Sequence, residues 1–242
     1  MRAIFSRYDR RSLVALAVLG GLYLVMALLY GHMIDWTRGM DWLLAGIWFF
    51  MTGVLVWDID PRRDLRLVAV GLVGGLVIEW WGTTTGLWTY YTAERPPLWI
   101  LPAWPVAALT IERLGLMVDR MLPAGPLRAL WLVLPIFVAF MIRFLWPQVG
   151  VLSSQVVIVL MLGVLATTGA ARRDVVVFIA GSTLGVFLEY WGTSRYCWTY
   201  YTREIPPVEA IFAHGFASVA FRRGLDLLER LAGAVPLRRL AA

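Results

Sequence analysis

Two glutamates, Glu79 and Glu189, stand near the ends of apolar stretches, and each is followed by a run of aromatic residues. A carboxyl group in apolar surroundings is costly when ionised, so it is protonated, paired or turned toward a polar cavity. The faces of aromatic rings attract positive charge. An acid beside such rings has the chemistry needed to make a carbocation from an isoprenoid double bond, without a metal ion or a nucleotide.

The two glutamates belong to a repeated segment. Residues 79–97 and 189–207 align without a gap at an offset of 110, and both read E-x-W-G-T at the start and W-T-Y-Y-T-x-E-x-P-P at the end. The offset continues outside the segment, where it relates Gly71 and Gly75 to Gly181 and Gly185. We therefore interpret Glu79 and Glu189 as opposing catalytic groups across one chamber.

Divergence between the copies adds a third candidate. His214 occupies the position of Trp104 at the same offset, and an imidazole is suited to relaying protons near neutral pH. We predict that His214 acts with the two glutamates. The candidate substrate-binding residues are Trp81, Trp88, Tyr90, Tyr91, Trp104, Trp191, Arg195, Tyr196, Trp198, Tyr200 and Tyr201.

A plainer interpretation of these residues stays open. Trp and Tyr gather at both surfaces of a membrane as an aromatic belt that needs no ligand. Each glutamate would then accept hydrogen bonds from Trp N–H and Tyr O–H groups and hold the following loop in place. Gly82 and Gly192 are expected to end their helices in left-handed caps.

Composition places the chain in a membrane. Of its 242 residues 60% are hydrophobic and 16% charged, and the mean hydropathy is +0.71. A soluble domain carries about a quarter charged residues. Eight apolar runs are each near the roughly 20 residues that span a bilayer. They are 13–30, 42–57, 65–83, 98–118, 127–146, 155–171, 175–193 and 208–228.

These runs predict an all-α, polytopic membrane helix bundle of eight transmembrane helices. The offset of 110 divides it into a first four-helix repeat, 1–120, and a second, 121–242, within one membrane domain. An even number of helices per repeat keeps both copies in the same orientation, so the repeat is parallel. Its pseudo-twofold axis is expected along the membrane normal.

The arginines predict the orientation. With the N-terminus in the cytoplasm, 17 of the 22 basic residues, all of them arginines, fall on the inner side. Only Arg38, Arg95, Arg143, Arg195 and Arg203 are left outside, as the positive-inside rule requires. We expect a multi-pass protein of the cell inner membrane with both termini cytoplasmic. Because the arginines are scattered at helix ends, we expect no nucleic-acid partner.

The sequence favours chemistry without a cofactor. A single cysteine, Cys197, excludes a cysteine metal cluster, and the chain has no phosphate-binding loop or aspartate-rich magnesium motif. His32 and His214 are too weak a pattern to indicate haem. We expect no metal and no cofactor. The expected partners are membrane lipids and a hydrophobic isoprenoid or lipid substrate.

The first copy resembles the membrane carotenoid hydratases and, more distantly, the small-subunit type of lycopene cyclase. The resemblance rests on Glu79, Gly82, Thr85-Gly86, Tyr90-Tyr91 and the stretch from Leu101 to Trp104. It implies protonation of a polyene or polyprenyl end, followed by water capture or ring closure. Two other classes remain open: a non-catalytic lipid- or pigment-binding protein or carrier, and a structural subunit of a membrane complex.

Overall fold

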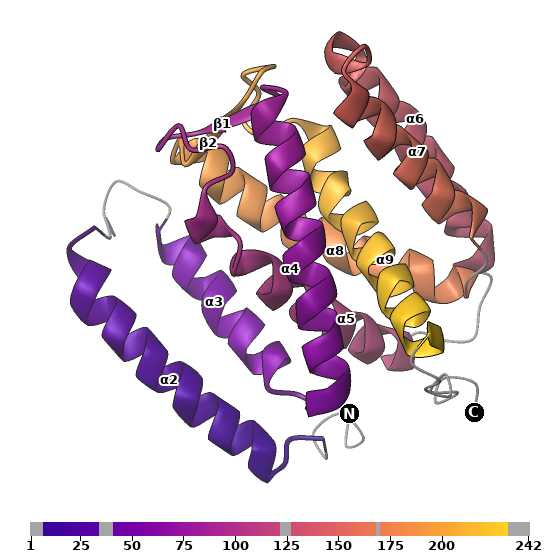
Figure 1. The fold of residues 1–242 in the computed structure, drawn as a ribbon. Coiled ribbons are helices and arrows are strands. Elements are labelled where there is room, and N and C mark those ends of the chain that lie inside the picture. The colour runs from indigo at the N-terminus through magenta and orange to yellow at the C-terminus, as the bar shows by residue number, and fades with distance from the viewer. Residues whose placement is uncertain (1–6, 34–40, 122–126, 168–169, 232–242) are drawn as a thin grey trace.

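The computed structural model describes residues 7–33, 41–121, 127–167 and 170–231, and these are almost entirely helical (Figure 1). The eight α-helices of these ranges are α2 (Arg10–Tyr30), α3 (Asp41–Leu55), α4 (Pro61–Thr84), α5 (Ala103–Met121), α6 (Val133–Phe144), α7 (Leu152–Ala166), α8 (Ala171–Ser194) and α9 (Val208–Leu231). Short 3-10 turns are η1 (Gly31–Met33), η2 (Leu98–Ile100), η3 (Leu127–Leu132) and η4 (Trp146–Gln148). The strands are β1 (Trp88–Tyr90) and β2 (Trp198–Tyr200). The prediction of an all-α bundle is confirmed.

Local capping explains where the helices begin. Asp60 accepts hydrogen bonds from the backbone N–H groups of Arg62 and Arg63, and Pro61 occupies the first turn of α4. Such a cap followed by proline is a strong helix start. Helix α4 therefore begins four residues before the apolar run that predicted it. Asp9 caps α2 in the same way.

Four helices form the centre of the bundle. Helices α4, α5, α8 and α9 pack on one another, while α2 and α3 lie on one flank and α6 and α7 on the other (Figure 1). Close approach needs residues without a Cβ. A Cβ added at Gly181 in α8 would lie 2.9 Å from the Cα of Gly215 in α9, and one at Gly71 in α4 would lie 3.0 Å from the Cα of Pro105 in α5.

At one end of the bundle the two strands pair with each other. The pairing is antiparallel and centred on Thr89 and Thr199. The N–H of Tyr91 donates to the carbonyl of Cys197 at 3.1 Å, and the N–H of Tyr201 donates to the carbonyl of Leu87 at 2.9 Å. The two bonds are equivalent, because Tyr91 and Tyr201, like Leu87 and Cys197, are related by the offset of 110. The two copies of the repeated segment thus meet through equivalent backbone contacts.

At the opposite end the same four helices share a buried ion cluster. Glu112 in α5 is only 5% exposed and accepts hydrogen bonds from Arg63, Arg173 and Arg222. The offset of 110 relates Arg63 to Arg173, but it relates Glu112 to a residue of opposite charge, Arg222. Because the two pair directly, opposite charges meet where the copies face each other.

Two further ion pairs flank this cluster. Arg113 donates to Asp64 at 2.5 Å, and Arg223 donates to Asp174 at 2.5 Å. The second pair is the first at an offset of 110. The ion cluster therefore ties α4 to α5 and α8 to α9 by matching contacts, as the strands do at the other end.

Four segments in the described ranges are long and apolar enough to cross a membrane: Arg10–Leu29, Pro61–Thr84, Leu98–Met121 and Ala171–Ser194. The apolar helices α3 and α7 are shorter, as is the stretch Leu130–Phe144 that contains α6. Both termini, and the topology-setting Arg2, Arg38, Arg238 and Arg239, lie outside the described residues. The orientation of the chain stays a prediction.

The ion cluster allows a charge-exchange experiment. Glu112→Arg alone would bury four guanidinium groups together, and we expect it to lower the free energy of unfolding by roughly 3–5 kcal/mol. The double variant Glu112→Arg/Arg222→Glu keeps one carboxylate beside Arg63 and Arg173 and should recover most of this loss. Thermal unfolding in detergent measures both. The recovery will be incomplete, because Arg222 also pairs with Asp226 at 2.9 Å. If the double variant were no more stable than Glu112→Arg, positions 112 and 222 would not have equivalent surroundings.

Candidate functional site

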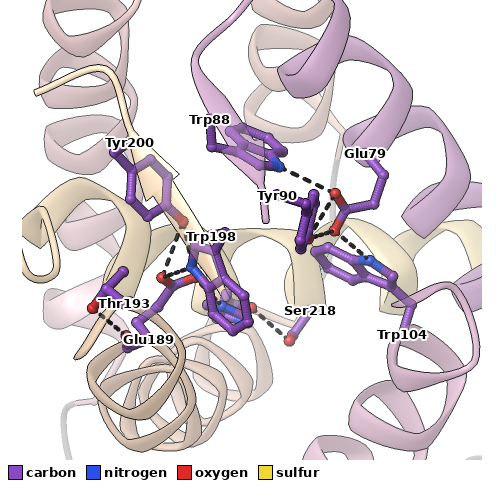
Figure 2. A network of polar contacts seen from close by, with 10 residues as sticks. Glu79, Trp88, Tyr90, Trp104, Glu189, Thr193, Trp198, Tyr200 and Ser218 are labelled. Atoms are coloured by element: carbon purple, nitrogen blue, oxygen red, sulfur yellow. Dashed lines mark hydrogen bonds and ion pairs between the residues drawn. The ribbon is translucent and has the colours of Figure 1, made fainter. Parts of the chain in front are cut away.

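Glu79, near the end of α4, is buried among hydrogen-bond donors. It is 3% exposed. The indole N–H of Trp88 donates to Oε2 at 3.1 Å, and the indole N–H of Trp104 donates to Oε1 at 3.1 Å. The hydroxyl of Tyr90 lies 2.9 and 3.0 Å from the two carboxyl oxygens (Figure 2). Both oxygens of the carboxyl group are satisfied.

Glu189, in α8, has the matching environment. It is 5% exposed, with the indole N–H of Trp198 at 2.9 Å from Oε2 and the hydroxyl of Tyr200 at 3.0 Å from both oxygens. The third partner is Nε2 of His214, 2.9 Å from Oε1. His214 thus takes the place that Trp104 has in the first copy. The imidazole is the one partner that differs.

The two carboxyl environments form one network. The rings of Trp104 and His214 stack on each other, with centroids 6.0 Å apart and planes at 13°. Rings from the paired strands also cross between the copies: Trp88 lies 6.0 Å from Tyr200, and Tyr90 lies 5.9 Å from Trp198. Figure 2 shows rings of both copies between the two carboxyl groups. We call these residues the paired-glutamate network: Glu79, Trp88, Tyr90, Trp104, Glu189, Trp198, Tyr200 and His214.

Glycines position the indoles, but not as helix caps. Gly82 and Gly192 lie inside α4 and α8, which continue to Thr84 and Ser194, so the predicted left-handed caps are wrong. A Cβ at Gly82 would lie 1.9 Å from Cη2 of Trp88, and one at Gly192 would lie 2.0 Å from Cη2 of Trp198. Each glycine leaves the space that its indole fills.

The turn after each helix takes the left-handed conformation instead. It falls on Gly86, with φ of 73°, and on Tyr196, with φ of 56°. Thr83 and Thr193 donate to the backbone carbonyls of Glu79 and Glu189, each at 2.6 Å. These contacts hold the last helical turn that carries each carboxyl group.

The two tyrosines are fixed as donors. Burial, and after it the negative charge of Glu79, raises the pKa of Tyr90 above its ordinary value. Burial and the charge of Glu189 raise the pKa of Tyr200 in the same way. Both phenols therefore keep their protons at any physiological pH and donate to the carboxyl groups.

Two of the predicted binding residues in each copy lie in the network: Trp88 and Tyr90, and Trp198 and Tyr200. Trp104 lies there too, as a donor to Glu79. Neither Trp81 nor Trp191 donates to a glutamate. Trp81 packs edge-on against Trp88 with ring centroids 6.0 Å apart, but its indole N–H donates to Ser154 of α7 at 3.1 Å. Trp191 donates to Asp41 of α3 at 3.2 Å.

The remaining predicted residues also have other surroundings. Arg195 forms an ion pair with Asp41 at 3.3 Å. Tyr91 and Tyr196 are 67% and 65% exposed. Tyr201 donates to the carbonyl of Phe144 at 2.7 Å. None of these side chains contacts either carboxyl group, so they form a rim around the network.

Sequence reasoning missed several contributors. Trp99 packs against Tyr90 with ring centroids 5.4 Å apart. Asp41 and Ser154 accept hydrogen bonds from the indole N–H groups of Trp191 and Trp81. The offset of 110 does not relate Asp41 to Ser154, so the repeat gave no signal for them.

The network is closed. One cavity of about 40 Å³ lies beside it, lined by Thr83, Trp88, Thr89, Tyr90, Ala93, Glu94 and Arg95. Sites for drug-sized ligands measure about 300–1,000 Å³. Trp88 and Tyr90, which line this cavity, both donate to Glu79 and stand between the two. Among the described residues no group of three or more His, Cys, Asp or Glu side chains is placed to hold a metal ion.

No family model, curated protein or solved structure matches the chain. The interpretation of the site therefore depends on its own geometry.

The glycines predict a steric test. Gly82→Ala or Gly192→Ala forces an indole out of its position, and we expect each to destabilise the protein by about 1–3 kcal/mol. Gly163→Ala, in α7, is the matched control, since a Cβ there has no neighbour within 4 Å. Thermal unfolding and tryptophan fluorescence measure the effect. Equal stability of Gly82→Ala and Gly163→Ala would contradict the tight packing of Trp88.

Proposed function

We propose that the protein is an integral membrane enzyme that protonates a double bond of an isoprenoid or carotenoid and directs the cation to ring closure or water capture. The observation that carries the proposal is the carboxyl–imidazole pair of Glu189 and His214, enclosed by aromatic rings and facing a second carboxyl group, Glu79. An acid, a base and cation-stabilising ring faces are the parts that this chemistry needs.

The membrane setting is part of the proposal. We propose eight spans arranged as a 4+4 parallel repeat, with the ion cluster at the cytoplasmic end and the paired-glutamate network near the outer surface. Apolar residues on outward faces support it, among them Leu13, Leu24 and Leu28 of α2, which are 62–78% exposed. In water such a helix face would be unfavourable, whereas lipid tails accommodate it.

The chemistry proceeds by a balanced proton transfer. The carboxyl O–H of one glutamate gives its proton to an alkene carbon, the π electrons form the new C–H bond, and the carboxyl group becomes a carboxylate. The adjacent carbon is left as a cation, which the faces of Trp88, Trp198 and neighbouring rings stabilise. Water or a second double bond then adds to the cation, and the proton released from the adduct returns to a carboxylate.

The 40 Å³ cavity marks the proposed entry. It reaches Trp88 and Tyr90, which touch Glu79, and it is lined on its other side by Glu94 and Arg95 of the loop. An extended polyene end is narrow enough to follow this path once the indole of Trp88 turns aside. The lipid-facing helices would hold the rest of a long apolar substrate.

One observation favours a second function. Both carboxyl groups are fully hydrogen-bonded in a closed network, which is the arrangement expected of a structural pin. In that case the protein binds or carries a lipid or pigment at the exposed rings, which include Trp80, Tyr91, Trp99 and Tyr190. The bound molecule would then leave chemically unchanged.

Glutamine substitutions separate the two functions. We expect Glu189→Gln to reduce turnover of a carotenoid or isoprenoid in liposomes by about 100-fold or more, since general acid–base groups contribute 10²–10⁴-fold, and we expect Glu79→Gln to reduce it as well. Glu204→Gln is the matched control, because Glu204 belongs to the repeated segment but is exposed. Product masses are measured by mass spectrometry.

The contrary result is clear. Full turnover in both Glu79→Gln and Glu189→Gln would rule out acid catalysis by the network. A co-purifying lipid whose mass the protein never changes, bound equally by all three variants, would establish the binding function.

A further inference from the structure

We infer that Glu189 is the carboxyl group that exchanges protons, through His214 and a polar track between α8 and α9, while Glu79 has no partner that relays a proton. The use of this difference between Glu189 and Glu79 rests on the proposed function, but the difference itself concerns proton exchange alone. It follows from the donors around each carboxyl group and from the places where the two copies differ.

Glu79 has no partner that relays a proton. An indole N–H has no acceptor capacity, so Trp88 and Trp104 each require an acceptor. Glu79 supplies it for both. The hydroxyl of Tyr90 lies 2.9 and 3.0 Å from the two carboxyl oxygens, and burial raises the pKa of this phenol, so it keeps its own proton. A proton on Glu79 therefore has no path away through these three partners.

Glu189 has one partner that works in both directions. A neutral imidazole nitrogen either donates or accepts, and a protonated ring donates from both nitrogens. The contact of 2.9 Å between Oε1 and Nε2 of His214 is therefore kept whether the proton lies on oxygen or on nitrogen. The proton moves between them without breaking the bonds from Trp198 or Tyr200.

The polar track is found in one copy only. Ser182 and Ser218 have Leu72 and Ala108 at the equivalent positions. Ser218 lies one turn along α9 from His214 and donates to its carbonyl at 2.7 Å. Ser182 is 8% exposed and lies against Gly215, and its Oγ has no hydrogen-bond partner among the described residues.

A small cavity continues the track to the ion cluster. It is lined by Ser218, Glu112 and Arg222 together with apolar residues, and its volume of about 10 Å³ is close to that of a single water site. In the proposed track a proton passes from this cavity by Ser218, which bonds to the backbone carbonyl of His214, and by Ser182 to the imidazole. In the first copy the same line is occupied by Ala108, Leu72 and Trp104.

The groups that face the pair are few. Tyr200 from β2 and Tyr90 from β1 keep their protons, and Glu79 from α4 has only Tyr90 and two indoles as partners. Helix α5 presents Trp104, which does not titrate. Asp41 of α3 pairs with Arg195 beside Trp191, away from the imidazole. The two groups here that can pass a proton directly between them are therefore Glu189 and His214.

The exchange step is balanced. When Glu189 has given its proton away, its carboxylate accepts from the Nε2–H of a neutral imidazole. A proton delivered along the track binds Nδ1, and the Nε2 proton moves to Oε1, which leaves a neutral carboxyl group and a neutral imidazole.

Infrared spectroscopy with ¹³C-labelled glutamate tests the assignment in liposomes without a substrate. We expect a protonated-carboxyl band that appears and disappears with pH, that survives in Glu79→Gln and that vanishes in Glu189→Gln. The exchange variant Trp104→His/His214→Trp moves the imidazole to the other copy, where Gly75 provides the space that Gly185 provides beside His214. In that background the band should vanish on adding Glu79→Gln instead.

Two further variants keep the test decisive. Should the exchange variant fail to fold, His214→Gln serves, because its amide can donate to Glu189 but cannot relay a proton, and the band should then appear much more slowly after a pH jump. Ser182→Ala/Ser218→Ala should slow the appearance of the band after a pH jump by about tenfold.

A band that vanishes in Glu79→Gln of the unmodified protein, or one unchanged by His214→Gln, would overturn the inference. An unaltered rate in the serine variant would overturn the track. A protein that shows the expected bands but turns over no isoprenoid would remove the proposed enzyme activity and leave the inference standing.

Discussion

The structure depends on how two carboxyl groups are stabilised inside an apolar helix bundle. A buried carboxylate needs several donors, and a single helix cannot supply them because its own backbone N–H groups are already bonded. At Glu79 the donors come from the strand after the helix and from the next helix, through Trp88, Tyr90 and Trp104. The loop must fold back over the helix end. That requirement places β1 and β2 side by side and brings α5 against α4 and α9 against α8.

The ion cluster imposes a matching constraint at the other end. Three guanidinium groups gather around Glu112, so that each of the central four helices contributes one charged group, and Arg222 has a second carboxylate partner in Asp226. The central helices are thus held at both ends by polar contacts, and apolar packing through glycines such as Gly71 and Gly181 fills the distance between. The flanking helices are less constrained, and α2 is covered by little of the protein.

Much of this arrangement is predictable from the sequence. The eight apolar runs gave the eight helices, and the offset of 110 correctly paired Glu79 with Glu189 and Trp104 with His214. The partners of Trp81 and Trp191 were not predictable, because Ser154 and Asp41 lie on flanking helices whose sequences do not repeat. The role of Gly82 was also missed, since a glycine near a helix end is typical of a cap. Only the folded loop reveals that it makes room for Trp88.

The stacked rings of Trp104 and His214 separate a structural interpretation from a functional one. If the network served only to hold two loops, an indole in both copies would satisfy both carboxyl groups, and the surroundings of Glu79 show that an indole fits. An imidazole is smaller, fills less of the space beside Gly185 and brings a titratable group into an apolar interior. At the equivalent contacts, Trp104 can only donate to Glu79, whereas His214 can donate to Glu189 or accept from it. The serines along α8 and α9 depart from the first copy in the same direction, toward polarity. Packing alone gives no reason for these changes, whereas the proton transfer proposed for Glu189 does.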